Sequence, residues 1–162
     1  MASTGKKVLI IVENLPVPLD RRVWQESLAL KEYGHDVSVV CPKMRGYNLE
    51  YEKLNGIKIY RHFIANEASG IIGFMFEYLS ALWGETICVF KAWRNGRFDI
   101  IHLCNPPDIL FLIALPYKWL FNVKIIFDIH DLWPEMFAAK FSNKNPLFWL
   151  VKFAEKCTIS LS

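Results

Sequence analysis

Short apolar runs alternate along the chain with longer segments whose apolar residues recur at helical spacing. Continuous β-branched runs such as Val8 to Val12 are typical of strands that are buried on both faces, as in a parallel sheet. Strands are predicted over 8–12, 36–41, 57–63, 98–103 and 123–128, and 57–63 alternates as a half-exposed edge strand does. Helices are predicted over 21–33, 70–94, 109–121 and 145–156.

Capping and turn residues mark where these elements begin and end. Asp20 precedes the first helix as its N-cap, and Gly34 occupies the position just beyond its last turn. The polar segment 43–56 is predicted as a loop, and the helix over 109–121 is predicted to be buried and to bend near Pro116. Strands that alternate with helices predict an α/β fold with a Rossmann-like, doubly wound parallel sheet.

The chain is predicted to be one domain, residues 1–162. A chain of 162 residues can bury roughly two thirds of its unfolded surface, which is enough for a full core. Residues 158–162 are similar to the beginning of a sixth strand. Because the chain stops there, we expect a domain that is truncated near its last strand.

Composition and charge exclude two classes of protein. A hydrophobic content of 53% and an aromatic content of 15% argue against disorder, which needs few apolar residues and high charge. The net charge of +3, from 19 Lys+Arg and 16 Asp+Glu, is too small to indicate a nucleic-acid binder. We therefore expect no nucleic-acid partner.

Cysteine spacing and the length of apolar runs bear on location. The four cysteines are scattered, and no pair has the C-x-x-C spacing of a zinc or redox site. Free thiols are typical of the reducing cytosol. The five apolar residues after Lys7 are too few for a signal peptide, and 74–90, the nearest approach to a membrane span, is interrupted by Glu77 and Glu85. We predict a cytoplasmic protein without a membrane span.

The most informative segment is the predicted strand 123–128 with the loop after it. Four polar side chains cluster there: Asp128, His130, Asp131 and Glu135. Open parallel sheets bind ligands beyond the carboxyl ends of their strands, which favours a binding site. His130 is the candidate catalytic residue, because imidazole can donate a hydrogen bond to a ligand hydroxyl or accept one. The alternative is a solvated loop in which Asp131 caps a helix and Glu135 stabilises its first turn.

The first predicted loop contains a second candidate site. Residues 13–20 hold no glycine, which argues against the NAD or FAD site that G-x-G-x-x-G forms there. The loop ends instead in Asp20, Arg21 and Arg22. Two cations in the first turn oppose the helix dipole, so they suit a bound anion such as a phosphate. Alternatively, both arginines point to solvent, or Arg22 pairs with Glu26 one turn on.

Asn105 and the histidines allow further interpretations. Asn105 follows the predicted strand 98–103 and either reaches a ligand or serves turn chemistry alone. Asp128-x-His130 also resembles the opening of a metal-dependent phosphoesterase site, which needs more ligands from other strand ends. The remaining histidines lack acid-rich surroundings in the sequence and are interpreted as structural: His35, His62 and His102. We predict no metal ion and no cofactor.

Several motifs, in this order, make the chain similar to a known family. They are Asp20-Arg21-Arg22-Val23-Trp24-Gln25-Glu26, Leu28 to Leu30 with Gly34 to Val37, Phe98 to His102, and Asp128 to Glu135. The chain resembles the N-terminal half of GT-B glycosyltransferases, specifically glycosyltransferase family 4. The resemblance spans nearly the whole chain. Many members have Gly-Gly in the first loop, and the Asp-Arg version seen here resembles a subset of the family.

The resemblance implies a retaining transferase that moves a sugar from a nucleotide-sugar donor to a glycolipid or polysaccharide acceptor. Residues 1–162 would be its acceptor-side domain, inactive alone, and the donor-binding C-terminal domain would be absent from this chain. His130 would touch the transferred sugar, and the first loop would face the donor phosphates. Two other functions stay open: a stand-alone Rossmann-like binding module and a metal-dependent phosphoesterase.

An apolar patch on the helix over 70–94 raises the question of a membrane partner. Apolar side chains gather between Ile71 and Trp83, and the basic residues Lys91, Arg94 and Arg97 lie just beyond. This arrangement suits peripheral attachment at the inner face of the membrane, where a lipid-linked acceptor would be reached. The alternative is that these side chains simply cover the sheet.

Overall fold

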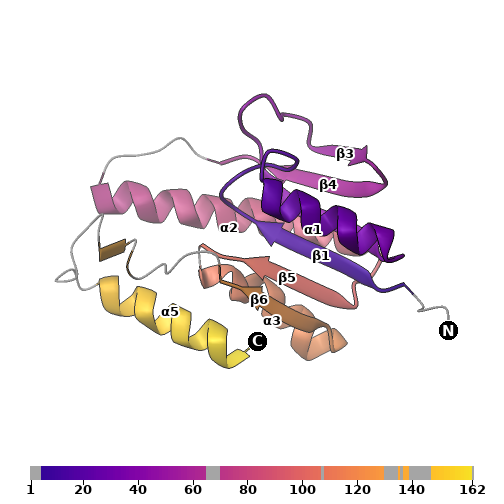
Figure 1. Ribbon diagram of the computed structural model, residues 1–162. Coiled ribbons are helices and arrows are strands. Elements are labelled where there is room, and N and C mark those ends of the chain that lie inside the picture. Colours follow the sequence, from indigo (N-terminus) through magenta and orange to yellow (C-terminus); the bar gives the residue numbers. More distant parts are fainter. Residues whose placement is uncertain are drawn as a thin grey trace.

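Six strands form one sheet in the order β3-β4-β2-β1-β5-β6 (Figure 1). The computed structural model describes residues 5–64, 70–106, 108–129, 135, 137, 138 and 147–161. The strands are β1 Lys7–Val12, β2 Asp36–Pro42, β3 Tyr51–Leu54, β4 Ile57–His62, β5 Ile100–Cys104 and β6 Lys124–Asp128. The helices are α1 Arg21–Glu32, α2 Gly70–Arg94, the 3₁₀ turn η1 Asp108–Leu110, α3 Phe111–Phe121 and α5 Leu147–Leu161.

The sheet is built outward from β1 in two directions. β1 pairs in parallel with β2 on one side and with β5 on the other. β4 continues the parallel sheet beyond β2, and β6 continues it beyond β5. Between β1 and β5 the strand order reverses, and open α/β sheets bind ligands at such a switch point. The predicted doubly wound parallel sheet is confirmed.

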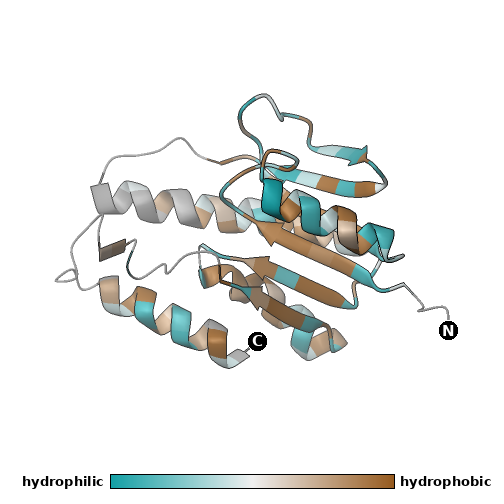
Figure 2. Ribbon diagram, viewed as in Figure 1, coloured by the Kyte–Doolittle hydropathy of each residue, from teal (hydrophilic) through white to brown (hydrophobic). Residues whose placement is uncertain are grey.

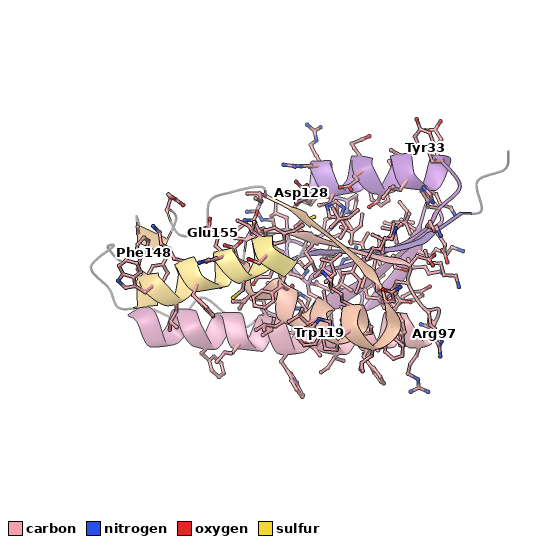
Figure 3. The ribbon with its side chains drawn as sticks, turned by 90° about the horizontal axis from the view of Figure 1, so that it is seen from below. Tyr33, Arg97, Trp119, Asp128, Phe148 and Glu155 are labelled. Atoms are coloured by element: carbon pink, nitrogen blue, oxygen red, sulfur yellow. The ribbon has the colours of Figure 1, made fainter. Side chains whose placement is uncertain are left out.

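Helices cover both faces of this sheet. α1 lies on one face, and α2 and α3 lie on the other (Figures 1 and 3). Successive strand residues point to opposite faces, so Ile10 belongs to the core with Ile59, and Leu9 belongs to the core with Leu103. Figure 2 shows the central strands largely brown, whereas much of α1 is teal. Two apolar cores therefore hold the carboxyl edge of the sheet in place.

α1 begins and ends where the capping residues predict. The Asp20 carboxylate accepts a hydrogen bond from the backbone N–H of Val23 at 3.0 Å. At the other end Gly34 has a φ of 88°, which glycine adopts without steric cost, and the N–H of His35 donates to the carbonyl of Leu30. The N-terminus of α1 is thereby fixed at the carboxyl edge of the sheet.

The β3–β4 hairpin corrects two predictions. Residues 51–54 form a strand and not part of a loop, so β4 lies inside the sheet and not at its edge. Ile57 and Ile59 of β4 are fully buried. Asn55 and Gly56 join the strands with φ of 50° and 83°, as a two-residue type I′ turn requires. This Asn-Gly pair was the available sequence signal, and the polar composition around it obscured it.

Three expectations for the C-terminal half are wrong. The apolar run of β6 is typical of a buried strand, but β6 ends the sheet order and its Ile126 is 48% exposed. α3 is not fully buried, since Trp119 and Leu120 are both more than two thirds exposed. The segment 158–161 continues α5 and does not begin a sixth strand. Apolar and β-branched residues favour strands only weakly, and packing partners decide the outcome.

α2 confirms the predicted helix over 70–94. Cys88, Val89 and Ala92 lie on its buried side, against the core that contains Leu103. Within the described residues, no helix combines the length and the apolar character that crossing a membrane requires.

Candidate functional site

Side chains from separate sequence motifs converge where the carboxyl ends of β5 and β6 meet the N-terminus of α1. Arg22 donates from Nη2 to both carboxylate oxygens of Asp128, each at 2.8 Å. Asp128 is the last residue of β6 and lies on the side of the sheet that faces α1 (Figure 3). The Arg22 side chain is 57% exposed and that of Asp128 is 25% exposed. The ion pair thus joins the first helix to β6 at a position that solvent and ligands can reach.

His102 of β5 extends this contact into the protein. Its Nδ1 lies 2.7 Å from Oε1 of Glu26, and its Nε2 lies 3.8 Å from Oδ2 of Asp128. The residue is buried, and its Nε2 makes no hydrogen bond. Because the Glu26 carboxylate can only accept, Nδ1 carries the proton of this bond. Arg22, Asp128, His102 and Glu26 form the network that we call the edge network.

The edge network corrects two interpretations. Arg22 pairs with Asp128, not with Glu26 one turn on, and Glu26 pairs with His102. His102 was interpreted as a structural histidine inside an apolar strand, but it belongs to this cluster of polar groups. The sequence already indicated that Arg22 and Glu26 lie on the same face of α1, because they are four residues apart. The order of the strands supplied their partners.

The remaining residues of the predicted anion site have different surroundings. Asp20 acts as the N-cap of α1. Arg21 is exposed at the same turn. Arg22 has Asp128 as an internal counterion, so Arg21 is the arginine that is better placed for an incoming anion. The anion site itself stays a prediction.

The contacts of Asn105 favour a role in the turn over direct contact with a ligand. It is buried, its side-chain amide donates to Oδ1 of Asp108 at 3.0 Å, and its backbone N–H donates to the carbonyl of Asp128 at 3.2 Å. Burial raises the pKa of Asp108 to about 6, although the hydrogen bond from Asn105 acts to lower it. Asn105 therefore braces the end of β5 against the end of β6.

The predicted catalytic residue cannot be placed in the same way. His130 and Asp131 lie outside the described residues, and Glu135 is described and exposed. Their roles stay predictions. The chain leaves β6 immediately after Asp128, two residues before His130, and Arg22 holds Asp128 in place.

A second buried polar cluster lies at the carboxyl end of β4. Nε2 of His62 is 3.8 Å from Oε1 of Glu85 on α2, and both side chains are 1% exposed. Burial lowers the pKa of His62 to about 4. Burial, and then the charge of Glu13, raise the pKa of Glu85 well above its usual value. The contact therefore joins a neutral histidine and a carboxylic acid, and it is not an ion pair.

Arg61, also on β4, secures the loop that follows β1. It is buried, its Nη2 donates to the carbonyl of Val17 at 2.7 Å, and it forms an ion pair with Glu52. Its Nη1 donates to the carbonyl of Leu49 at 3.3 Å. One buried guanidinium thus ties the first loop and the polar segment before β3 to the sheet.

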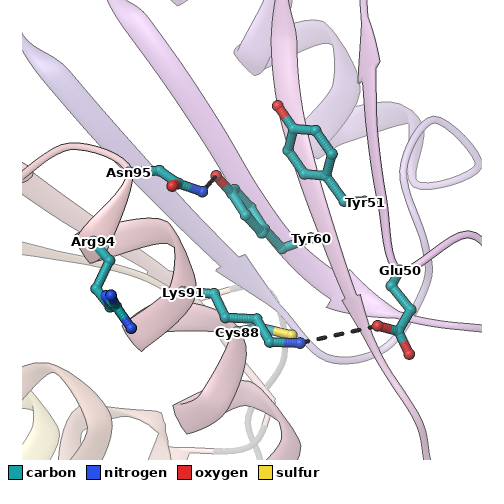
Figure 4. A pocket seen from close by; sticks show the side chains of 7 residues that line it. All are labelled: Glu50, Tyr51, Tyr60, Cys88, Lys91, Arg94 and Asn95. Carbon is teal, nitrogen blue, oxygen red and sulfur yellow. Dashed lines mark hydrogen bonds and ion pairs between the residues drawn. The ribbon is translucent and has the colours of Figure 1, made fainter.

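An open pocket of about 420 Å³ lies between the β3–β4 hairpin and α2 (Figure 4). Nζ of Lys91 is 3.9 Å from Oε2 of Glu50, and the side-chain amide of Asn95 donates to the hydroxyl of Tyr60 at 3.1 Å. The pocket lies on the β4 side of β1, whereas the edge network lies on the β6 side. Among the predicted site residues that the structure describes, none lines it.

Comparison with known proteins identifies the family. Residues 19–158 match the model of glycosyltransferase family 4. The chain belongs to glycosyltransferase family 4. No curated protein matches the family 4 chain in sequence.

Solved structures confirm the fold of this family 4 domain. A structure of sucrose-phosphate synthase from Thermosynechococcus elongatus superposes with a TM-score of 0.65 at 14% identity, over 94% of this chain and 40% of that chain. A second structure of that enzyme gives a TM-score of 0.57 at 13% identity, over 92% of this chain and 70% of that chain. The chain thus spans 40% of the length of the first structure. The likeness confirms the fold expected for the N-terminal half of a GT-B glycosyltransferase.

Proposed function

We propose that this family 4 domain is the acceptor-side domain of a cytoplasmic, retaining glycosyltransferase. The enzyme would move a sugar from a nucleotide-sugar donor to a glycolipid or polysaccharide acceptor. The observation that supports this most is the edge network, which gathers Arg22, His102 and Asp128 at the switch point of the sheet within the family-matched range.

The residues at the carboxyl ends of the strands each have a role in this proposal. Arg21 and the N-terminus of α1 present positive charge to the donor phosphates. Asp128 fixes the chain two residues before His130, and His130 bonds to a hydroxyl of the transferred sugar. The C-terminal domain of the full-length protein holds the rest of the donor. No cofactor is required, since the nucleotide sugar is itself a substrate.

Transfer by the full-length protein tests this proposal. Catalysis needs a closed cleft between two domains to orient donor and acceptor, so we expect no transfer by residues 1–162 alone. In the full-length protein, His130→Ala should lower kcat/KM roughly tenfold or more, the effect of one lost hydrogen bond to a reacting group. His35 lies just before β2, at the amino ends of the strands. His35→Ala is therefore the control and should leave kcat/KM unchanged.

Three results would contradict parts of the proposal. Transfer by residues 1–162 above a no-protein control would remove the need for a second domain. Unchanged kcat/KM in His130→Ala, with a native melting temperature, would remove the role of His130. Sugar binding without transfer by the full-length protein would favour a stand-alone binding module.

The outer side of α2 and α3 supports peripheral attachment to a membrane, which is part of the same proposal. Large apolar side chains that are at least 40% exposed lie there: Phe76, Leu79, Trp83, Ile87, Phe90, Leu112, Trp119, Leu120 and Phe121. Those on α2 recur every three or four residues, so they form one stripe along the helix. Contiguous exposed apolar surface of this kind is typical of an interaction site.

Basic side chains accompany this apolar stripe. Lys91, Arg94 and Arg97 are exposed close to it, and Arg97 and Trp119 lie on the same side of the molecule (Figure 3). Cations beside apolar side chains suit an anionic lipid surface. Trp93 packs against Phe98 and Phe121, and Glu85 is buried, so neither belongs to this exposed surface.

A further inference from the structure

We propose that His102, Cys104 and Asp128 form a binding site for a divalent transition-metal ion, and that Zn²⁺ is the ion they suit best. One ligand atom from each of the three residues lies within 4.8 Å of the others. This inference goes beyond the proposed transferase function and does not depend on it.

The sheet brings the three ligands to one face. Cys104 and Asp128 are paired in register between β5 and β6. His102 is two residues before Cys104, so its side chain leaves β5 on the same side. Imidazole, thiolate and carboxylate groups are the ligands that zinc takes in proteins, at about 2.0–2.3 Å. The Asp128-x-His130 motif needed further metal ligands from other strands, and the neighbouring strand β5 provides His102 and Cys104.

His102 is held in the way that metal-binding histidines are held. Its Nδ1 donates to Glu26 at 2.7 Å, so Nε2 is the ring nitrogen whose lone pair a metal ion can take. Nε2 is buried without a hydrogen bond and lies 3.8 Å from Oδ2 of Asp128. A buried acceptor without a donor costs free energy, and an ion between Nε2 and Oδ2 removes that cost. Two ligands of a tetrahedral zinc ion lie about 3.3 Å apart, so a small closure suffices.

The charges around the thiol favour a cation. Burial, and then the carboxylates of Glu26, Asp128 and Asp20, raise the pKa of the Cys104 thiol, whereas the guanidinium of Arg22 acts to lower it. Arg22 contacts both oxygens of Asp128, so it can keep Oδ1 while the ion takes Oδ2. On binding, the S–H bond of Cys104 breaks, an S–metal bond forms, and the proton leaves to solvent. Three protein ligands leave a fourth position for water.

Cobalt spectroscopy on the purified wild-type chain tests the site without any variant. After dialysis against a chelator, Co²⁺ is titrated into residues 1–162. We expect saturation at one equivalent with a thiolate-to-cobalt charge-transfer band and the visible bands of a tetrahedral ion, and Zn²⁺ should displace it. No saturable binding, or a spectrum without the thiolate band, would overturn the proposal.

Variants separate this site from adventitious binding. Cys104→Ser and His102→Gln should each weaken Zn²⁺ binding at least 100-fold, and Glu26→Gln should weaken it about 10–100-fold through the orientation of His102. Cys157→Ser removes a more accessible thiol of α5 and is the matched control, with no expected change. Wild-type affinity in Cys104→Ser, or lost affinity in Cys157→Ser, would show an adventitious ion only.

Thermal unfolding of the wild-type chain is a further test, and its result does not depend on how well the variants fold. With Zn²⁺ at 100 times its Kd, the melting temperature of the wild-type chain should rise by about 5–10 °C. The same concentration of Mg²⁺, which prefers oxygen ligands, should leave it unchanged. An equal rise with both ions, or none with Zn²⁺, would contradict a His–Cys–Asp site.

Discussion

At the scale of single residues, the contact between His62 and Glu85 shows how a buried polar pair is tolerated. Nδ1 of His62 lies 3.2 Å from the carbonyl of Phe63, so it carries the proton, and the unprotonated Nε2 lies 3.8 Å from Oε1 of Glu85 without a hydrogen bond. Glu85 retains its proton because burial raises its pKa. Gly84 permits the approach, since a Cβ on it would lie 2.9 Å from Cβ of His62.

The raised pKa of Glu85 makes folding stability depend on pH. Below its unfolded pKa of 4.5, Glu85 is protonated in both the folded and the unfolded state, so its titration does not change the free energy of unfolding. As pH rises, the unfolded state loses the proton first, so stability falls until the folded pKa is passed. Glu85→Gln removes this loss and should raise the melting temperature at pH 7 to 8, with the gain shrinking to nothing near pH 4. Thermal unfolding between pH 4 and 8 measures it.

A surface substitution of the same kind controls for the change in net charge. Glu32→Gln removes an exposed carboxylate from α1 and should leave the pH dependence unchanged. A constant difference between Glu85→Gln and wild type at every pH would show that folding does not raise the pKa of Glu85. His62 acts separately, because its pKa of about 4 removes stability only as pH falls from its usual 6.5.

At the scale of elements, the β3–β4 hairpin depends on two left-handed residues. Asn55 and Gly56 have φ of 50° and 83°, and the register they set places Ile57 and Ile59 in the core. Residues other than glycine and asparagine adopt such a φ at a cost of roughly 1–2 kcal/mol. The turn therefore contributes directly to how the hairpin pairs.

Gly56→Ala should reduce the free energy of unfolding by roughly 1–2 kcal/mol, because alanine resists the left-handed conformation. The added Cβ would meet only Cε of Lys31, at 3.0 Å, and that flexible side chain can move. Asn55→Gly is the control, since glycine adopts the same φ freely, and its effect should stay within roughly 0.5 kcal/mol. Urea denaturation measures both, and equal stability of Gly56→Ala and wild type would contradict the type I′ turn.

At the scale of the whole molecule, the two faces of the sheet differ in what covers them. The α1 face carries the edge network, and the α2–α3 face carries the exposed apolar stripe with its basic neighbours. The switch point and the stripe are therefore available at the same time. The membrane attachment proposed above would therefore leave the edge network accessible to polar ligands.

Liposome flotation tests the membrane face. Residues 1–162 should float with anionic vesicles at low salt and less with neutral vesicles, because the cations contribute about 1 kcal/mol each near an anionic surface. Trp83→Ser combined with Trp119→Ser should reduce the floated fraction several-fold. Tyr33→Ser, at the end of α1 and 80% exposed, is the control and should float as wild type does. A protein that stays in the soluble fraction at every lipid composition excludes this face as a membrane contact.

The sequence by itself determined the fold class, the family and most of the helices and strands, although not β3. Caps such as Asp20 and Gly34 and the apolar periods act over a few residues, so they are visible without a partner. Tertiary structure alone decided which strand forms the edge, how far α3 and β6 are exposed, and which partners Arg22 and Glu26 take. Arg22 and Asp128 are 106 residues apart, and they meet only because β5 and β6 add to the side of β1 opposite β2. Local patterns cannot encode that order, since it follows from the packing of the whole sheet.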